Sequence, residues 1–264
     1  MAENGQARLV VAVDGPGSSG KSSVGAAAAK AVGYRFCDTG LLYRAVTWLA
    51  LQTGAPLEDP DRLVPLVARV SLVADEEGRL VRVFVDGEEV TELVRVAGVD
   101  TRVSEVARVP AVRRALLGAQ RALAAPGGIV MAGRDIGTVV LPGAGLKLYL
   151  DASVEARARR RARERGLAPE GPEAREILEQ LRRRDDVDAT RPVAPLALAQ
   201  DAIRIVTDDL DFDQTVELVV AAIRAAQLAG AAGQAGDGPV DDIPRGGTPT
   251  GDTARGDNPP GTAS

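Results

Sequence analysis

The sequence contains no histidine, and Cys37 is the only cysteine among its 264 residues. A zinc site and a Ser-His or Cys-His catalytic triad both need side chains that are missing here, so both are excluded. A single cysteine also excludes an internal disulfide framework. The chemistry left to the chain rests on Arg, Lys, Asp, hydroxyl groups and a bound magnesium ion, which are the groups that phosphoryl transfer uses.

Excess positive charge and long apolar runs are also missing. The formal net charge is −5, which argues against a general affinity for nucleic acid or anionic membranes. No signal peptide and no apolar run of membrane-spanning length is visible. Because 45% of the residues are hydrophobic, the chain can still build a real core. We therefore expect a soluble, cytoplasmic, monomeric protein with small-molecule partners and no role for nucleic acid or membranes.

A glycine-rich stretch near the N-terminus is the strongest motif. It follows the apolar residues 9–13, precedes a helix-forming segment, and has the G-x-x-x-x-G-K-S spacing of a P-loop. Its glycines allow a tight turn whose N–H groups face phosphate oxygens at the positive end of a helix dipole. Lys21 would contact the outer phosphates, and the Ser22 hydroxyl would hold a magnesium ion. The stretch consists of Gly15, Pro16, Gly17, Ser18, Ser19, Gly20, Lys21 and Ser22.

A Gly/Ser turn between a strand and a helix is the plainer explanation of this stretch. Two features favour phosphate binding. The flanking strand and helix come in the order that a P-loop needs. The chain otherwise uses arginine, and its only lysines are Lys21, Lys30 and Lys147, so a compact ammonium stands where a P-loop places one.

Alternating strands and helices predict an α/β fold with a parallel sheet. Expected strands cover residues 9–13, 34–37, 129–132, 146–150 and 202–206, and expected helices cover 21–32, 41–53 and 213–227. Thr39 would cap the second helix. Residues 54–128 combine helices with an antiparallel hairpin around Asp86-Gly87, which indicates an inserted small domain.

Two short motifs place charges at the carboxyl edge of the expected sheet, where open α/β folds bind ligands. Arg44 lies one turn into the second helix and fits a phosphate ligand and a solvated helix charge equally well. Gly133-Arg134-Asp135 follows a buried strand and brings a cation and a carboxylate to the same edge. A surface ion pair on a turn is the alternative for this motif.

Residues 157–190 are strongly basic. Two Arg-rich helices joined by a Gly/Pro connector at 166–172 are typical of a mobile lid over phosphates. Nucleic-acid binding is the alternative, but no aromatic residue between Tyr149 and Phe212 could stack on bases, and acidic residues are interspersed. We expect most of these arginines on solvated helix faces and two or three in contact with ligand.

The expected organisation follows from these segments. A flexible N-terminus covers residues 1–7, and a P-loop core covers 8–53 and 129–227, with the lid at about 157–190. The inserted domain occupies 54–128. Residues 228–264 are mostly small or polar and cannot bury enough apolar surface to offset their ordering entropy, so we expect a disordered tail.

Four motifs in this order resemble the bacterial cytidylate kinase family of P-loop nucleoside monophosphate kinases, over residues 8–224. They are Val13-Asp14-Gly15-Pro16 with the P-loop, Asp38-Thr39-Gly40-Leu41-Leu42-Tyr43-Arg44, Gly133-Arg134-Asp135-Ile136-Gly137-Thr138-Val139-Val140, and Arg184-Asp185-Asp186-Val187-Asp188 with Arg191-Pro192-Val193-Ala194-Pro195-Leu196. The resemblance implies a three-layer core with a parallel five-stranded sheet, an inserted monophosphate-binding domain containing a small antiparallel sheet, and a helical Arg-rich lid. It also implies Mg²⁺-assisted, in-line transfer of the γ-phosphoryl group of ATP to CMP or dCMP.

The resemblance further implies a role for each matching residue. Residues Gly15 to Ser22, together with Ser23, would hold the ATP phosphates, and the catalytic cations would be Lys21, Arg134 and Arg184. The monophosphate would be bound by Thr39, Arg44 and Arg134, with Tyr43 close by. Cytosine would be read by Ser104, Arg113, Asp135 and Arg191, and Asp188 would face the sugar. From the lid, Arg184 and one or more of Arg157, Arg160 and Arg161 would close on the transferring phosphoryl group.

Two positions depart from the family pattern. Ala132 stands where an aspartate is common, and Val187 stands where an arginine is, so that one lid cation is missing or supplied by Arg183. The nearest alternative function is that of a P-loop kinase for another nucleotide or small metabolite. A nucleic-acid-binding ATPase is more distant. A GTP-dependent switch would need an N-K-x-D motif, which the only two asparagines, Asn4 and Asn258, cannot form.

Overall fold

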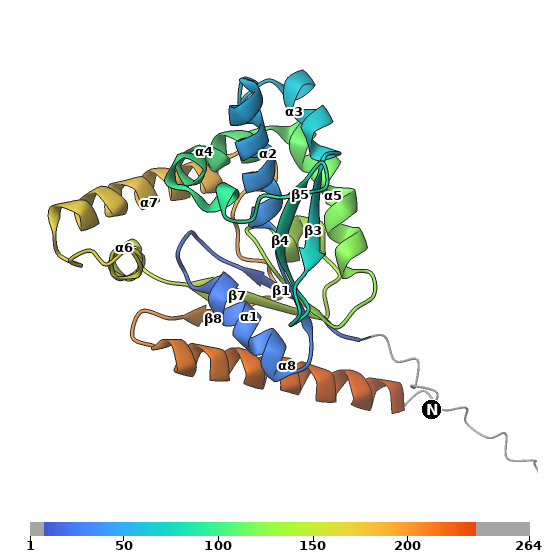
Figure 1. The fold of residues 1–264 in the computed structure, drawn as a ribbon. Helices are drawn as coiled ribbons and strands as arrows, with labels where there is room; N and C mark the ends of the chain where they lie inside the picture. Colours follow the sequence, from blue (N-terminus) through green and yellow to red (C-terminus); the bar gives the residue numbers. More distant parts are fainter. Residues whose placement is uncertain (1–7, 236–264) are drawn as a thin grey trace, which may run out of the picture.

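The computed structural model describes residues 8–235, which fold around one twisted sheet (Figure 1). The strand order is β3-β4-β2-β6-β1-β7-β8, with β5 paired to β4. The five strands from β2 to β8 run parallel, as the sequence predicted. Their bounds are β1 Val10–Asp14, β2 Arg35–Asp38, β6 Ile129–Ala132, β7 Leu146–Asp151 and β8 Ile203–Val206.

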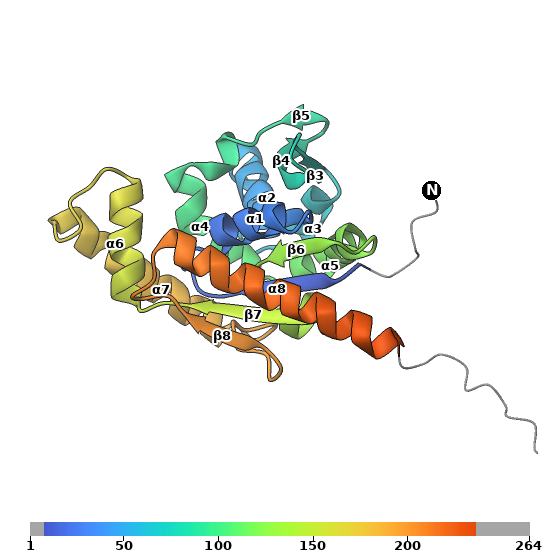
Figure 2. The ribbon, with the colours of Figure 1, turned by 90° about the horizontal axis from the view of Figure 1, so that it is seen from below.

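Helices cover both faces of the parallel strands and complete the expected three layers. Val11 and Val13 of β1 pack in one apolar cluster with residues of α1 (Lys21–Ala31) and α8 (Phe212–Ala235). Ala12 packs on the opposite face, in a cluster that includes Ala124 of α5 (Pro110–Ala124). Figure 2 shows α1 and α8 lying along one side of the sheet. Near-continuous apolar strands are the pattern of a sheet buried on both faces.

The hairpin of the inserted segment differs from the expectation of a separate small antiparallel sheet. β3 (Val70–Ala74) and β5 (Glu88–Glu89) pair antiparallel with β4 (Arg79–Val85). β4 also pairs parallel with β2, through Phe36 with Arg79 and Cys37 with Leu80. This pairing satisfies backbone groups that would otherwise be unpaired along the edge of β2. The hairpin therefore extends the main sheet.

The remaining helices of this segment form a second core. It gathers buried residues from α2 (Gly40–Thr53), α3 (Pro60–Val67), η1 (Leu93–Arg95), α4 (Ala97–Arg108) and α5 together with β4. Helix α2, which the sequence analysis placed in the P-loop core, packs here instead because its apolar face meets α3, α4 and β4. The residues that follow β2 thus lead directly from the sheet edge into this unit.

The Arg-rich segment forms the two expected helices, α6 (Val154–Glu164) and α7 (Pro172–Thr190). They pack on each other through a small apolar cluster that includes Ala158, Ala162, Ile177 and Leu181. Figure 1 shows the pair projecting from the carboxyl edge of the sheet, with α7 passing beside α4. The lid thus has its own core, separate from the sheet.

The last helix is longer than predicted. We expected it to end at Gln227 and a disordered tail to begin at residue 228, but α8 continues to Ala235, so the tail prediction was wrong over residues 228–235. Alanine is the best helix former, and the added residues include several, so the helix extends even though Leu228 is exposed. The other expectations for the termini, at 1–7 and over 236–264, lie outside the described residues. None of the helices within residues 8–235 combines the length and apolarity needed to cross a membrane.

Candidate active site

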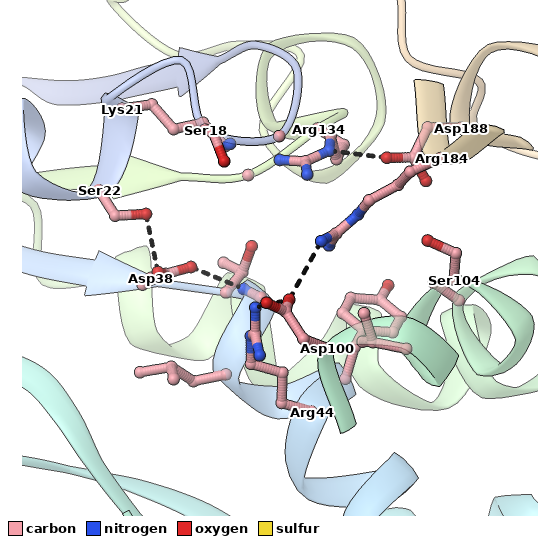
Figure 3. A pocket seen from close by; sticks show the side chains of 18 of the residues that line it. Ser18, Lys21, Ser22, Asp38, Arg44, Asp100, Ser104, Arg134, Arg184 and Asp188 are labelled. Atoms are coloured by element: carbon pink, nitrogen blue, oxygen red, sulfur yellow. Dashed lines mark hydrogen bonds and ion pairs between the residues drawn. The ribbon is translucent and has the colours of Figure 1, made fainter. Parts of the chain in front are cut away.

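A cavity of about 440 Å³ opens at the carboxyl ends of β1, β2 and β6, between the P-loop, α4 and the lid. Figure 3 shows its polar side chains converging from these elements. Most of the predicted site residues line it. They are Gly17, Ser18, Gly20, Lys21, Ser22, Ser23, Thr39, Tyr43, Arg44, Ser104, Arg113, Arg134, Asp135, Arg161, Arg184, Asp188 and Arg191.

The P-loop joins β1 to α1 in a strained turn. Ser18 and Gly20 both have positive φ, at 59° and 87°, and Gly20 caps α1. The Lys21 side chain is only 7% exposed and donates to the Pro16 carbonyl over 3.0 Å. The pKa of Lys21 lies well below its usual value, mainly because the side chain is buried and also because the charge of Arg134 is close by. An anion beside Lys21 would favour its charged form, as a phosphate site requires.

Ser22 and Asp38 lie together at the P-loop end of the cavity. Ser22 donates to one Asp38 oxygen over 2.8 Å, and the other Asp38 oxygen accepts from the Gly40 N–H over 3.0 Å. Thr39 occupies the N-cap position of α2, as predicted, but its hydroxyl makes no capping bond and donates to the Ala132 carbonyl over 2.9 Å. Asp38 provides the bond to the helix start, and sequence reasoning missed its position beside Ser22.

One hydroxyl and one carboxylate are hard oxygen ligands, which is what Mg²⁺ prefers. Among residues 8–235 there is no group of three His, Cys, Asp or Glu side chains arranged to hold a metal ion. This sparse set fits a magnesium ion that is shared with nucleotide phosphates, because such an ion takes only one or two ligands from the protein. Ser22 and Asp38 are therefore the side chains that would hold it.

Asp14, at the end of β1, was not among the predicted site residues. Its two carboxylate oxygens accept from the backbone N–H groups of Ile136 and Gly137 over 2.8 and 2.7 Å. These begin a turn of π-helix, η2 (Ile136–Val140), directly after the Gly133-Arg134-Asp135 motif. Asp14 thus fixes the loop that carries Arg134. Burial raises the pKa of Asp14 to about 6, against the opposing effect of the two backbone bonds.

This raised pKa predicts that the difference in stability between the wild type and Asp14→Asn depends on pH. A carboxyl with a pKa of about 6 when folded and 3.8 when unfolded stabilises the fold below 3.8, and this contribution is lost as the pH rises through 6. When the pH is lowered from 7.5 to 4.5, the free energy of unfolding of the wild type should rise by about 2 kcal/mol relative to that of the variant. Urea unfolding at both values measures this, with exposed Asp213→Asn as control. A pH-independent difference would contradict it.

The acceptor end of the cavity is a buried network of opposite charges. Arg113 forms an ion pair with Asp135, and Arg191 lies 3.6 Å from the other Asp135 oxygen. Arg134 donates to Asp188 over 2.9 Å. The Arg113 guanidinium also stacks 5.4 Å from the centre of the Tyr43 ring. Residues of the third and fourth motifs therefore meet in one wall, although Arg134 and Asp188 are 54 residues apart in sequence.

Several donors in this wall make no hydrogen bond. Arg113 Nε, Arg184 Nε and Arg191 Nη2 have no hydrogen-bond acceptor among residues 8–235. A buried donor without an acceptor costs about 1–3 kcal/mol, so an acceptor-rich ligand would be favoured here. Burial would raise the pKa of Asp188, but Arg134 and Arg184 outweigh it and lower that pKa. Burial and Arg134 lower the pKa of Arg184 to about 10, which leaves it charged at neutral pH.

Some predicted residues lie elsewhere. Arg157 points behind the P-loop, where it donates to the Gly17 carbonyl over 3.0 Å and pairs with Asp185. Arg160 donates to Thr207 after β8. Of the lid arginines, only Arg161 and Arg184 line the cavity. The P-loop residues Gly15, Pro16 and Ser19 are buried behind it, and a side chain at Gly15 would collide with the Leu150 carbonyl.

The two departures from the family pattern can also be placed. Ala132 is fully buried at the end of β6, and its carbonyl accepts from both the backbone N–H and the hydroxyl of Thr39. Val187 and Arg183 line a neighbouring cavity between α4 and the lid, outside the one that contains the P-loop. Arg183 therefore does not replace the missing lid cation in the main cavity.

Comparisons with known proteins agree with the resemblance seen in the motifs. Residues 11–225 match a family model described as cytidylate kinase. A cytidylate kinase from Geobacillus sp. (strain WCH70) is 44% identical over 213 residues, covering 80% of this chain and 94% of the relative. One from Enterococcus faecalis (strain ATCC 700802 / V583) is 42% identical over 217 residues, covering 82% and 94%. A solved gluconokinase from Sinorhizobium meliloti 1021 is 17% identical, with a TM-score of 0.45, covering 86% and 98%.

Proposed function

The chain belongs to the cytidylate kinase family and phosphorylates CMP or dCMP at the expense of ATP, and we propose that its cavity divides into an ATP half and an acceptor half. The ATP half is the P-loop with Lys21, and the acceptor half runs from Thr39 to Arg191. Arg134 and Arg184 lie between the two halves (Figure 3). The single observation that carries this division is the buried charge network of Arg113, Asp135 and Arg191, opposite the P-loop.

The reaction needs positioning and charge neutralisation more than it needs an acid or base. An oxygen of the CMP phosphate forms a bond to the γ-phosphorus of ATP while the bond to the β–γ bridging oxygen breaks, which releases ADP. Negative charge spreads over the transferring group, and Lys21, Arg134 and Arg184 are the cations placed to stabilise it. No side-chain nucleophile is required, in agreement with the absence of histidine.

Magnesium is proposed as the partner of ATP. Ser22 and Asp38 would hold it through their hydroxyl and carboxylate oxygens at the P-loop end of the cavity. Bound there, the ion would neutralise part of the negative charge of the ATP phosphates. The Ser22–Asp38 hydrogen bond keeps both oxygens on the same side of the P-loop.

Recognition of cytosine follows from the chemistry of its edge, which offers the N4 amino group as a donor and N3 and O2 as acceptors. Asp135 can accept from the amino group, and Arg113 and Arg191 can donate to the two acceptors. Ser104, half-buried on α4, lines the same part of the cavity. Uracil would present a carbonyl oxygen to Asp135 in place of the amino group, so it should be rejected. Asp188 is proposed to face the sugar.

A further proposal concerns partners. We propose a monomer that acts on the cytoplasmic nucleotide pool, with ATP and CMP or dCMP as its ligands and no role for nucleic acid or membranes. The lid arginines make ion pairs within the protein, including Arg157 with Asp185 and Arg182 with Glu155 and Glu179. Arginines neutralised in this way favour small phosphorylated ligands over nucleic acid.

A coupled assay of ADP release over CMP, dCMP, UMP, AMP and GMP tests the substrate. We expect kcat/KM for CMP or dCMP to exceed that for each other monophosphate by at least about 100-fold, because a site built to hydrogen-bond one base leaves buried groups unpaired with another. A preference for a purine monophosphate, or for a metabolite hydroxyl, would overturn the assignment.

A further inference from the structure

Asp100 on α4 is a partly buried carboxylate surrounded by arginines from three other elements. Its side chain is 10% exposed. One oxygen lies 2.5 Å from Arg44 of α2 and 3.2 Å from Arg184 of α7. The other forms an ion pair with Arg161 of α6 and lies 3.9 Å from Arg165. Figure 3 shows Asp100 between Arg44 and Arg184, at the centre of the cavity.

The charges in this cluster do not balance. Burial alone would raise the pKa of Asp100, but Arg44, Arg161 and Arg184 outweigh it and lower that pKa, so the carboxylate is ionised at neutral pH. One negative charge thus faces four guanidinium groups, and removing it would leave the arginines to repel one another. Asp100 also ties the lid helices to the acceptor side of the cavity, as the Arg134–Asp188 pair does.

Two of the arginines that pair with Asp100 are also proposed ligands of the substrate phosphates. Arg44 is proposed to bind the CMP phosphate, and Arg184 the transferring phosphoryl group. Arg44 has its Nη1 directed at the Val94 carbonyl, 3.5 Å away, and its Nη2 on Asp100. An N–H that already donates to a carboxylate is not free for a phosphate, and the two anions would also repel each other.

We propose that Asp100 is an internal competitor of the substrate phosphates, a positioning residue that gathers Arg44, Arg161 and Arg184 and releases Arg44 and Arg184 when phosphates bind. This rests on the proposed function, because CMP is the competing ligand. Each binding event then includes the breaking of at least one ion pair. Asp100 therefore stabilises the cluster and weakens CMP binding at the same time.

These two effects give opposite signs when the carboxylate is removed. In Asp100→Asn, KM for CMP should fall about 3- to 10-fold, since no ion pair must be exchanged, whereas kcat should stay within about twofold. The unfolding temperature measured without nucleotide should fall, because the arginines lose their counter-ion. A purely structural residue would lower the unfolding temperature without improving the KM for CMP.

Steady-state kinetics and calorimetric CMP binding test this, with Glu105→Gln as matched control. Glu105 is also on α4, but it pairs with exposed Arg102 over 2.6 Å and is not part of the Asp100 cluster, so its KM should equal that of the wild type. Asp100→Glu keeps the charge and should not show the gain. Asp100→Ser and Asp100→Ala are made alongside, and variants with native circular dichroism are compared.

The outcomes separate the two proposals. If the wild type does not phosphorylate CMP, the proposed function fails. If the wild type is active and folded Asp100 variants bind CMP no more tightly than it does, the competition is disproved. A measurement on the wild type does not depend on whether the variants fold. In an NMR spectrum of protein labelled at the aspartate carboxyl carbons, added CMP should shift the Asp100 resonance, because Arg44 leaves that carboxylate. An unchanged resonance would overturn the proposal.

Discussion

Replacing Lys21 with alanine should lower kcat by about 10²- to 10³-fold and leave CMP binding within a few-fold of the wild type. The Lys21 ammonium lies in the ATP half of the cavity, 3.0 Å from the Pro16 carbonyl and away from the Arg113–Asp135 pair. Its loss removes one cation from the transferring group but none from the base-binding wall. Single-turnover rates with saturating ATP, together with calorimetric CMP affinity, measure the two effects separately.

Lys30→Ala is the matched control for this variant. Lys30 also lies on α1 and is a lysine, but its side chain is 69% exposed and pairs with Glu77 on the surface. This variant should keep wild-type turnover, because surface pairs contribute little. Lys21→Arg should not restore activity, since the ammonium lies in a site only 7% exposed and a guanidinium is larger. If Lys21→Ala turned over CMP normally, the P-loop would not hold the reacting phosphates.

The features that the sequence predicted well are those whose pattern is local. The P-loop is eight consecutive residues, and apolar runs such as residues 9–13, which contain most of β1, mark strands buried on both faces. The Gly133-Arg134-Asp135 motif follows its strand directly. For these, the residue types alone determine the turn, the strand and the edge of the sheet at which the side chains end.

The features that the sequence missed depend on contacts between distant segments. β4 joins β2 through only two residue pairs, and no local signal marks a hairpin that will extend a neighbouring sheet. Asp100 lies in an amphipathic helix without a motif, and its ion pairs form only because α4 packs near α2, α6 and α7. The one feature of the sequence that points to Asp100 is its position on the same helix face as Ser104, a predicted site residue four positions later.

The lid arginines show the same limit at the level of one helix. Helical periodicity places Arg157 and Arg161 on one face of α6, yet Arg157 supports the P-loop and Arg161 reaches Asp100. Arg160 turns to Thr207. Which acceptor each guanidinium reaches is set by how α6 docks against the core, and that is a tertiary property.

Replacing Asp135 with asparagine should abolish the preference for cytosine. The carboxylate is proposed to accept from the N4 amino group, and asparagine keeps its shape while losing its charge and one acceptor. We expect kcat/KM for CMP to fall by about 10²- to 10³-fold and that for UMP to change little, so the CMP/UMP ratio collapses. KM for ATP should stay within about twofold, because Asp135 lies at the acceptor end. The substrate panel provides the measurement.

The buried position of Asp135 makes its control important. Asp135 and Arg113 are each 7% exposed, and breaking such a pair by truncation costs about 3–5 kcal/mol, so lost activity alone could reflect lost folding. Asp201→Asn is the comparison variant, because it also removes the partner of a buried cation, Lys147 at 8% exposure, and neither residue lines the cavity. It should lower stability without changing the CMP/UMP ratio. If Asp135→Asn reduced activity equally toward every monophosphate, Asp135 would support the wall without reading the base.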